Sequence, residues 1–414
     1  MKQARKNGDV EEIEIPEIKH VKLRIILAIF FLVVSVVSLT YSLSSCVMVE
    51  NGWREISAEA EETNCSGEFV FQYNIGYNGA SASVEYNELR ELYTDAMVTA
   101  YQVFNADRNF VDVHNVYYIS AHPNEEVEVG DLLYQSLETL EENQCRLQYL
   151  APVYKLYDDI FFSENEDEAK LYDPLVNTQV AEFFKECAAY AADPEQIQLK
   201  LMGNNKVMLC VSDEYLAFAK QEGIDSFLDF YWMKNAFIVD YVADIMEENN
   251  HLAGYIASYN GFTRNFDKTD SDFAVTLYHC DGDTIYNAAT MNYSGARSIV
   301  YFRNYSLGDT DERYYYTTKQ GDDRTMYLSL EDGTCISSIN ELIMQSTSES
   351  CAEILMKSIP IYVTDSFDEE TVQELSQSGI YAVYCKDNVI YSNDSSVEFG
   401  DLYEKDGVSY SLEK

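Results

Sequence analysis

The centre of the chain reads Leu228-Asp229-Phe230-Tyr231-Trp232-Met233-Lys234-Asn235-Ala236-Phe237-Ile238-Val239-Asp240. Val239, Val242 and Ile245 recur at helical spacing in and after this stretch, which predicts a helix over Phe237–Glu248. A strand and a turn are expected before that helix, and a further strand begins at Ala253. The stretch therefore places strand, turn and helix next to one another in the middle of the sequence.

The same interleaving of helices and strands extends in both directions along the chain. Residues 69–85 predict a strand with Phe69, Phe71 and Tyr73 on one face. Further strands are expected at 198–202 and 207–211, which form a hairpin around Gly203, and at 380–384 and 389–391. Helices are expected at 88–104, 126–142, 180–192, 348–356 and 367–376, and the acidic run 163–170 is expected to be a solvated loop. This order predicts a mixed α/β (α+β) domain.

Composition supports a folded chain and argues against one class of partner. Hydrophobic residues make up 47% and aromatic residues 14% of the sequence, which is enough to build a core despite the formal net charge of -43. A surface this acidic repels phosphate backbones, so no nucleic-acid partner is expected.

The N-terminal part has the features of a membrane anchor. The segment Ile25–Leu43 carries no charge and is just long enough to span a bilayer. Lysine and arginine precede it and glutamate follows it, which predicts an N-terminus in the cytoplasm. The expected organisation is a cytoplasmic tail at 1–24, a transmembrane segment or lipoprotein-type signal at 25–45, a linker at 46–68 and an extracytoplasmic domain at 69–414. The end of the segment, Leu43-Ser44-Ser45-Cys46, resembles a lipoprotein signal, so lipidation of Cys46 is an alternative to an uncleaved anchor.

Cysteine and histidine spacing gives no motif for metal or redox chemistry. The eight cysteines after Cys46 could form four disulfides or remain as buried thiols, and no C-x-x-C pair occurs among them. None of the five histidines lies at ligand spacing from another, and the common nucleotide-binding and hydrolase motifs are absent.

Several stretches occur in an order that resembles the FAD:protein FMN transferase (ApbE) family, from about Phe69 to Phe399. The stretch from Leu228 to Asp240 resembles the family pattern L-D-L-G-x-x-x-K-G-x-x-x-D. The other stretches that carry the resemblance are Tyr172-Asp173-Pro174-Leu175-Val176, Ser258-Tyr259-Asn260-Gly261, Ser306-Leu307-Gly308-Asp309 with Glu312-Arg313-Tyr314-Tyr315, and Ser348-Glu349-Ser350-Cys351-Ala352-Glu353-Ile354-Leu355.

The resemblance implies a membrane-anchored, extracytoplasmic transferase. Such a protein splits FAD with the help of a divalent cation, here Mg²⁺ or Ca²⁺, and attaches FMN to a Ser or Thr of a partner protein. It implies nucleotide-binding roles for Asp173, Lys234, Asn235, Asp240, Asn260 and Gly261. It places the cation ligands at Glu349 and Glu353, on one face of the helix expected there, and it assigns no catalytic residue.

The sequence also departs from the family pattern. The two family glycines fall on Tyr231 and Ala236, the family lysine falls on Asn235 with Lys234 one place earlier, and Met326 and Tyr327 stand where the family has a histidine. These departures keep a second interpretation open, a catalytically degenerate flavin-binding or assembly protein of the same fold. A third interpretation is a surface protein of unrelated function.

Overall fold

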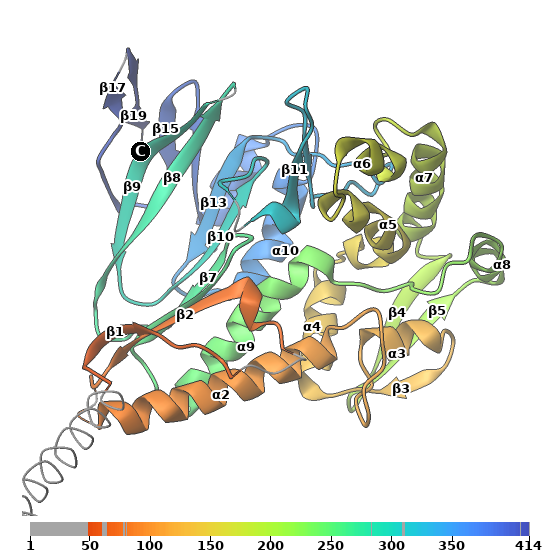
Figure 1. The fold of residues 1–414 in the computed structure, drawn as a ribbon, viewed down its shortest axis with the longest axis horizontal. Helices are drawn as coiled ribbons and strands as arrows, with labels where there is room; N and C mark the ends of the chain where they lie inside the picture. The colour runs from red at the N-terminus through yellow and green to blue at the C-terminus, as the bar shows by residue number, and fades with distance from the viewer. Residues whose placement is uncertain are drawn as a thin grey trace, which may run out of the picture. The chain divides into compact units, whose positions relative to one another are not determined.

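The computed structural model describes residues 49–59, 64–77, 79, 81–282, 284–308, 311–405 and 407–413. The predicted membrane segment Ile25–Leu43 and Cys46 lie outside these residues. None of the helices in the described ranges has the length and apolar character needed to cross a membrane. Residues 51–414 form one compact unit (Figure 1).

A nine-stranded sheet runs through this unit and joins segments that lie far apart in the sequence. All neighbouring strands are antiparallel except the last pair, β15 and β19. The order is β1 (Gly52–Glu55), β2 (Phe69–Ile75), β6 (Gly254–Ser258), β7 (Phe262–Asn265), β10 (Arg297–Arg303), β13 (Glu341–Ser346), β14 (Tyr381–Lys386), β15 (Val389–Ser392) and β19 (Ser411–Glu413).

Helices cover one face of the nine-stranded sheet. These are α9 (Lys234–Glu248) and α10 (Cys351–Tyr362), with α2 (Ala82–Val103) packed against α9. Aromatic rings fill the space between helices and sheet: Phe302 of β10 stacks on Tyr362 of α10 with ring centroids 4.5 Å apart. This layer contains the helix that the sequence predicts at Phe237–Glu248, with its start one turn earlier.

A second, smaller sheet covers the opposite face. It has the order β16 (Glu398–Gly400), β9 (Thr284–Ser294) and β8 (Asp272–Asp281). Leu277 and Met291 of this sheet pack with Ile343 and Val383 of the large sheet in a separate hydrophobic core. The strands of the two sheets thus enclose a second core, on the far side of the large sheet from α9 and α10.

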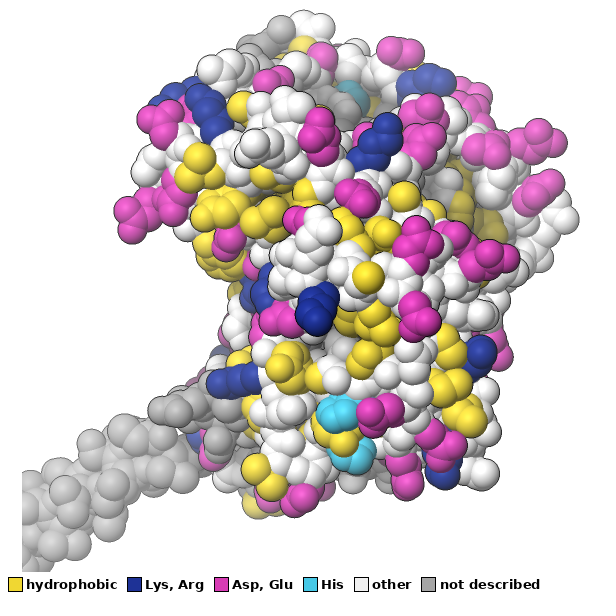
Figure 2. All heavy atoms as spheres, turned by 90° about the vertical axis from the view of Figure 1, so that its right-hand side faces the viewer, with side chains coloured by type: hydrophobic (Ala, Val, Ile, Leu, Met, Phe, Trp, Pro, Cys, Tyr) yellow, Lys and Arg dark blue, Asp and Glu magenta, His cyan; other side chains and the backbone are white. Residues whose placement is uncertain are grey.

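A helical lobe lies beside the large sheet (Figure 1). It contains α3 (Val116–Ala121), α4 (Asp131–Glu142), α5 (Ala151–Phe161), α6 (Glu166–Tyr172), α7 (Thr178–Ala192), α8 (Asp213–Glu222) and a sheet of β3 (Glu126–Glu128), β5 (Lys206–Val211) and β4 (Ile197–Gly203). On the side of the molecule shown in Figure 2, acidic side chains surround hydrophobic ones. Besides four short 3-10 helices, the remaining elements are α11 (Glu369–Ser376) and two small hairpins. The hairpins are β11 (Tyr315–Thr317) with β12 (Asp323–Thr325), and β17 (Glu404–Lys405) with β18 (Val408–Ser409).

The mixed α/β fold and the hairpin around Gly203 are confirmed, whereas several boundaries were wrong. The first strand ends at Ile75 because the chain turns at Gly76, and α2 begins at Ala82. The acidic run predicted as a loop contains α6, because the Asn165 side chain caps that helix by accepting from two backbone N–H groups. Acidic residues in the first turn also suit the positive end of the helix dipole.

Two further expectations differ from the structure. Residues 52–55 fall in the predicted linker, yet they form β1, where Trp53 packs edge-on against Phe273 at 5.6 Å. The first part of the expected helix 126–142 is strand β3, and the helix itself begins at Asp131.

The eight cysteines from Cys65 to Cys385 are free thiols, and four of them are buried.

Candidate functional site

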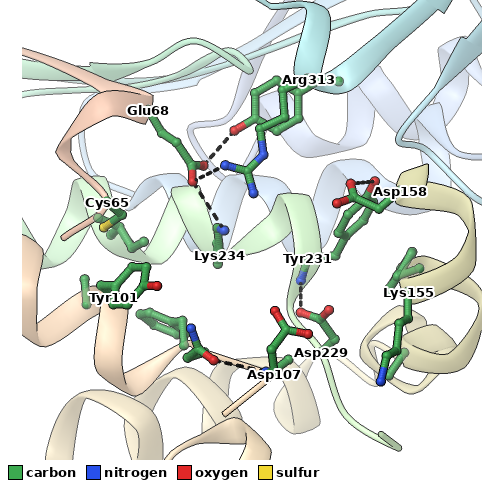
Figure 3. A pocket seen from close by; sticks show the side chains of 18 of the residues that line it. Cys65, Glu68, Tyr101, Asp107, Lys155, Asp158, Asp229, Tyr231, Lys234 and Arg313 are labelled. Atoms are coloured by element: carbon green, nitrogen blue, oxygen red, sulfur yellow. Dashed lines mark hydrogen bonds and ion pairs between the residues drawn. The ribbon is translucent and has the colours of Figure 1, made fainter. Parts of the chain in front are cut away.

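A cavity of about 580 Å³ opens beside the N-terminal end of α9. The end of α2, the start of α5, the segment from Ser226 to Tyr231 and the turn that holds Arg313 form its walls (Figure 3). Its aromatic lining consists of Tyr101, Phe104, Tyr154, Tyr231, Tyr259 and Tyr314. Its charged lining consists of Lys155, Lys234, Arg313, Glu68, Asp107, Asp158 and Asp229.

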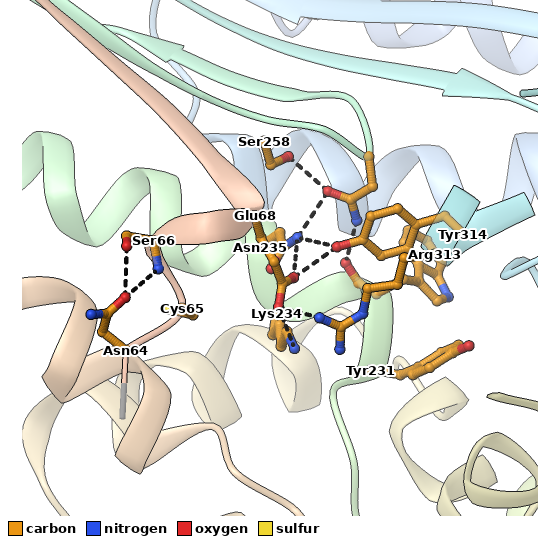
Figure 4. Close-up of polar contacts among 12 residues, drawn as sticks. Asn64, Cys65, Ser66, Glu68, Tyr231, Lys234, Asn235, Ser258, Arg313 and Tyr314 are labelled. Atoms are coloured by element: carbon orange, nitrogen blue, oxygen red, sulfur yellow. Dashed lines mark hydrogen bonds and ion pairs between the residues drawn. The ribbon is translucent and has the colours of Figure 1, made fainter. Parts of the chain in front are cut away.

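Glu68 is the centre of the polar contacts at one end of the cavity (Figure 4). One carboxylate oxygen lies 2.7 Å from the Arg313 guanidinium and 3.5 Å from the Lys234 ammonium group. The other accepts hydrogen bonds from the Tyr314 hydroxyl at 2.7 Å and the Asn235 amide at 3.2 Å. Burial alone would raise the pKa of Glu68, but Lys234, Arg313 and these hydrogen bonds outweigh it and lower the pKa to about 2. At neutral pH, an ionised Glu68 therefore already neutralises part of the charge of both cations.

A buried network of amides supports this cluster. The Asn235 side chain donates to Asn260 at 3.0 Å, and Asn260 in turn donates to the backbone carbonyl of Trp232 at 3.0 Å. The Ser258 hydroxyl also donates to Asn260, at 2.7 Å. This network links the first turn of α9 to the end of β6. It holds the Asn235 amide in position to donate its hydrogen bond to Glu68.

Tyr231 occupies a backbone conformation that favours glycine. Its φ is +47°, at the position where the resemblance to the transferase family expects a glycine. A left-handed residue with a Cβ is strained by about 1–2 kcal/mol. Contacts offset that strain: the ring stacks on Tyr154 at 4.4 Å, and the hydroxyl donates to Asp158 at 2.9 Å. The turn at this position therefore also supplies an aromatic wall of the cavity.

Carboxylates gather at the opposite end of the cavity from Glu68. Figure 3 shows Asp107 and Asp229 pointing toward each other there. Burial raises the pKa of Asp229 to about 6, although the Tyr231 N–H at 2.7 Å and Lys234 act in the other direction. Burial also raises the pKa of Asp158. An aspartate that titrates near neutral pH beside a cavity can accept a proton from a bound ligand.

The structure brings together three of the residues that the resemblance marks for nucleotide binding. Lys234 and Asn235 contact Glu68 directly, and Asn260 joins them through its hydrogen bond with Asn235. Lys234 lines the cavity, and the two amides are buried below it. Gly261 follows in the turn between β6 and β7. A Cβ there would lie 2.1 Å from the carbonyl oxygen of Tyr301, so close packing against β10 accounts for the glycine.

The other two marked residues lie away from the cavity. Asp173 forms a buried ion pair with Arg324 at 2.9 Å beyond the end of α6. Asp240 accepts hydrogen bonds from the backbone N–H groups of Cys351 at 2.9 Å and Ala352 at 2.8 Å. Its carboxylate thus stabilises the N-terminal end of α10.

The two glutamates expected to bind a cation do not share a helical face. Helix α10 begins at Cys351 with Ser350 as its cap, so Glu349 precedes the helix and only Glu353 belongs to it. The Glu349 carboxylate forms an ion pair with Lys357 at 3.3 Å. Met326 and Tyr327, at the place of the family's histidine, are buried in the aromatic core beside Trp232.

Several cavity residues were not singled out from the sequence. Asp229, Arg313 and Tyr314 stand inside stretches that carry the family resemblance, so their position was a usable signal. Tyr231 was noted only as a departure from a family glycine. Glu68 gave no such signal, because its contact with Arg313 joins residues that lie far apart in the sequence.

Two solved structures of ApbE proteins have a fold similar to that of this chain. The chain is similar to the ApbE protein of Thermotoga maritima, with a TM-score of 0.56 and 13% identity over 84% of this chain and 96% of that one. It is similar to the flavin transferase ApbE of Vibrio cholerae, with a TM-score of 0.51 and 11% identity over 86% and 98% of the two chains. No protein-family model and no curated protein sequence matches the chain. The fold is therefore that of the ApbE flavin transferases, at very low sequence identity.

Proposed function

We propose that this chain is a flavin-binding protein of the ApbE-like fold, in which the cavity beside α9 binds the flavin ring and the transfer of FMN has been lost. The observation that carries the proposal is the aromatic lining of a cavity of about 580 Å³. Flat aromatic ligands bind well between tyrosine and phenylalanine side chains, with a few polar groups to orient them. Tyr231 and Tyr154 already present a stacked pair on this lining.

The charges of the cavity favour the ring over the phosphates of a flavin nucleotide. Three cationic side chains face four carboxylates on the lining. Two of the cations, Lys234 and Arg313, already pair with Glu68, and Lys155 pairs with Asp225 at 2.7 Å. A pyrophosphate would have to displace Glu68 from its cations and would face Asp107 and Asp229. We therefore expect riboflavin to bind at least as tightly as FAD.

Glu349 and Glu353 do not fit the divalent cation that the family resemblance implies for them. Glu349 forms an ion pair with Lys357. Asp240 accepts hydrogen bonds from backbone N–H groups at the N-terminal end of α10. A cation at Glu349 and Glu353 would have to break the Lys357 ion pair and gather ligands from a carboxylate outside the helix.

Calorimetric titration of the full-length chain with riboflavin, FMN and FAD tests the proposal. Riboflavin should bind at least as tightly as FAD to the native chain. Glu68→Gln should reverse this preference, because it frees Lys234 and Arg313 for a phosphate. Glu59→Gln is the matched control, since Glu59 pairs with Arg90 outside the cavity lining and should leave the preference unchanged. Absence of binding by all three flavins would refute a flavin-binding function.

One observation favours a second function, transfer of FMN from FAD to a partner protein. Asp229, with its pKa raised to about 6, could accept the proton of an attacking hydroxyl. Incubation with FAD, Mg²⁺ and candidate acceptor proteins, followed by mass spectrometry, would reveal a covalent FMN adduct. An adduct that depends on Asp229 would favour the transferase over the binding protein.

We also propose that the domain lies on the outer face of a membrane. This rests on the uncharged segment Ile25–Leu43 and the basic residues before it. Protease added to intact cells should digest the domain. Membrane attachment should persist in a Cys46→Ala variant if the segment, rather than a lipid, holds the chain.

A further inference from the structure

A second cluster of reactive side chains lies in the core between the large sheet and the small one. His279 comes from β8, Glu341 from β13 and Cys385 from β14. Their ligand atoms all lie within 4.8 Å of one another, and the residues are 8%, 0% and 2% exposed. None of the three lines the cavity beside α9. The cluster is thus separate from the proposed flavin site and belongs to a different core.

The completely buried Glu341 carboxylate is hydrogen-bonded, in part by the backbone N–H of Cys280, but it has no lysine or arginine partner among the described residues. One oxygen lies 2.5 Å from Nδ1 of His279, and the other accepts a hydrogen bond from the Tyr305 hydroxyl at 3.2 Å. Arg303, opposite Glu341 on β10, pairs with Asp311 at 3.0 Å instead. Among the described residues, no lysine or arginine forms an ion pair with Glu341. Buried carboxylates without such a partner commonly bind a metal ion or remain protonated.

An unpartnered hydroxyl lies at the same junction. Tyr410 is 6% exposed, and its hydroxyl has no hydrogen-bond partner among the described residues. Its ring packs edge-on against His279, with centroids 5.7 Å apart. A buried polar group without a partner beside three potential ligands indicates that the cluster lacks a component.

We propose that His279, Glu341 and Cys385 form a binding site for a transition-metal ion of the Zn²⁺ class. Imidazole nitrogen, carboxylate oxygen and thiolate sulfur are the donors that Zn²⁺ uses in proteins. The sulfur ligand distinguishes the site from a Mg²⁺ or Ca²⁺ site, because those ions take oxygen ligands. The Tyr410 ring packs against His279, so its unpartnered hydroxyl offers a further polar group at this junction.

Binding requires small movements and the release of protons. Tetrahedral Zn²⁺ holds adjacent N and O ligands about 3.3 Å apart, so Nδ1 of His279 and the Glu341 oxygen must separate from 2.5 Å. The metal replaces the proton that these two atoms share, and the Cys385 thiol loses its proton to become the thiolate ligand. Both protons pass to the solvent, and affinity should therefore rise with pH.

A metal ion at this site would cross-link the two sheets. His279 belongs to the small sheet, whereas Glu341 and Cys385 belong to neighbouring strands of the large one. A metal bound to all three connects the sheets across their common core. It would stabilise this half of the domain without contacting the proposed flavin site.

Cobalt titration of the full-length chain tests the proposal, with Co²⁺ as a spectroscopic probe for the Zn²⁺ site. The native chain should bind one equivalent and show a thiolate-to-cobalt band in the near ultraviolet. Cys385→Ser should lose that band and bind at least tenfold more weakly. Cys187→Ser is the matched control, because Cys187 is equally buried but lies in α7, and it should behave like the native chain. No binding by the native chain, or an unchanged band in Cys385→Ser, would overturn the proposal.

A measurement on the native chain alone covers the case in which Cys385→Ser fails to fold. X-ray absorption of the zinc-loaded chain should show one sulfur at about 2.3 Å and nitrogen or oxygen ligands at about 2.0–2.1 Å. A shell of nitrogen and oxygen ligands without sulfur would overturn the assignment.

Discussion

Glu68 and Glu341 are both glutamates held inside the domain, but their surroundings have opposite effects. Glu68 faces Lys234 and Arg313, and its pKa falls to about 2. Glu341 faces a histidine, a tyrosine and a cysteine, and burial raises its pKa. The first carboxylate is stabilised as an anion by the protein itself, whereas the second is a costly anion without an external cation. The neighbouring charges therefore produce an internal ion-pair cluster around the half-buried Glu68 and a candidate metal site around the fully buried Glu341.

The largest expected effect is that of Glu68→Gln on stability. The variant leaves Lys234 and Arg313 without their carboxylate, and the free energy of unfolding at pH 7 should fall by about 3 kcal/mol. The contribution of Glu68 is present above its ordinary pKa near 4.5 and is lost as the pH falls toward 2. Urea unfolding at several pH values should show the difference between native and variant shrinking in that window.

Glu59→Gln is again the control for this substitution. Its ion pair with Arg90 at 3.1 Å is exposed, so its loss should change the free energy of unfolding by less than about 0.5 kcal/mol. If the two variants were equally stable, the cluster around Glu68 would not be an internal ion-pair network.

Asp229→Asn should raise the free energy of unfolding at pH 7, whereas Glu68→Gln lowers it. Because the folded-state pKa is raised to about 6, the favourable contribution of the protonated group is complete below its ordinary pKa of 3.8 and is lost as the pH rises through 6. At pH 7 the native chain holds a costly anion. Asparagine keeps the acceptor for the Tyr231 N–H, so the variant should gain about 2 kcal/mol. Equal stability of variant and native chain at pH 7 and a gain only at pH 4 would contradict this explanation.

Glu341→Gln should change the stability of the metal-free chain by less than about 1 kcal/mol. Glutamine still offers an oxygen to the Tyr305 hydroxyl and removes a buried charge. Adding Zn²⁺ should raise the melting temperature of the native chain and leave that of the variant unchanged. A loss of stability as large as that of Glu68→Gln would show that the two carboxylates are held in the same way.

The smallest effect is expected for Mg²⁺ and Ca²⁺. Because Glu349 is engaged by Lys357, neither ion should shift the melting temperature by more than about 1 °C. A larger shift that disappears in the Glu349→Gln, Glu353→Gln double variant would restore the cation site that the family resemblance implies.

Local patterns in the sequence predicted the fold well where they were strong. The helical spacing of Val239, Val242 and Ile245 identified α9, and the order of motifs pointed to the ApbE-like architecture. Helix α6 was missed because its acidic composition suggested a solvated loop, although the capping Asn165 was visible in the sequence. Boundaries failed where a cap or a turn, rather than periodicity, decides the end of an element.

The candidate sites depended on contacts that local patterns do not contain. Lys234, Asn235 and Asn260 were identified, yet Glu68, the direct partner of the first two, fell in a predicted linker. The cluster of His279, Glu341 and Cys385 forms only when two sheets pack together, and His279 alone gave no motif. Long-range pairing thus decides which of the many acidic residues meet a cation and which do not.

The stacked pair of Tyr154 and Tyr231 has a consequence for how a flavin would be detected. Tyrosine rings in contact with a photoexcited isoalloxazine ring transfer an electron to it, and emission is then quenched. A flavin seated on this pair would give a yellow protein that is nearly dark under ultraviolet light. Absorption near the visible flavin bands, or release of the ligand by denaturation, would reveal an occupant that a fluorescence screen overlooks.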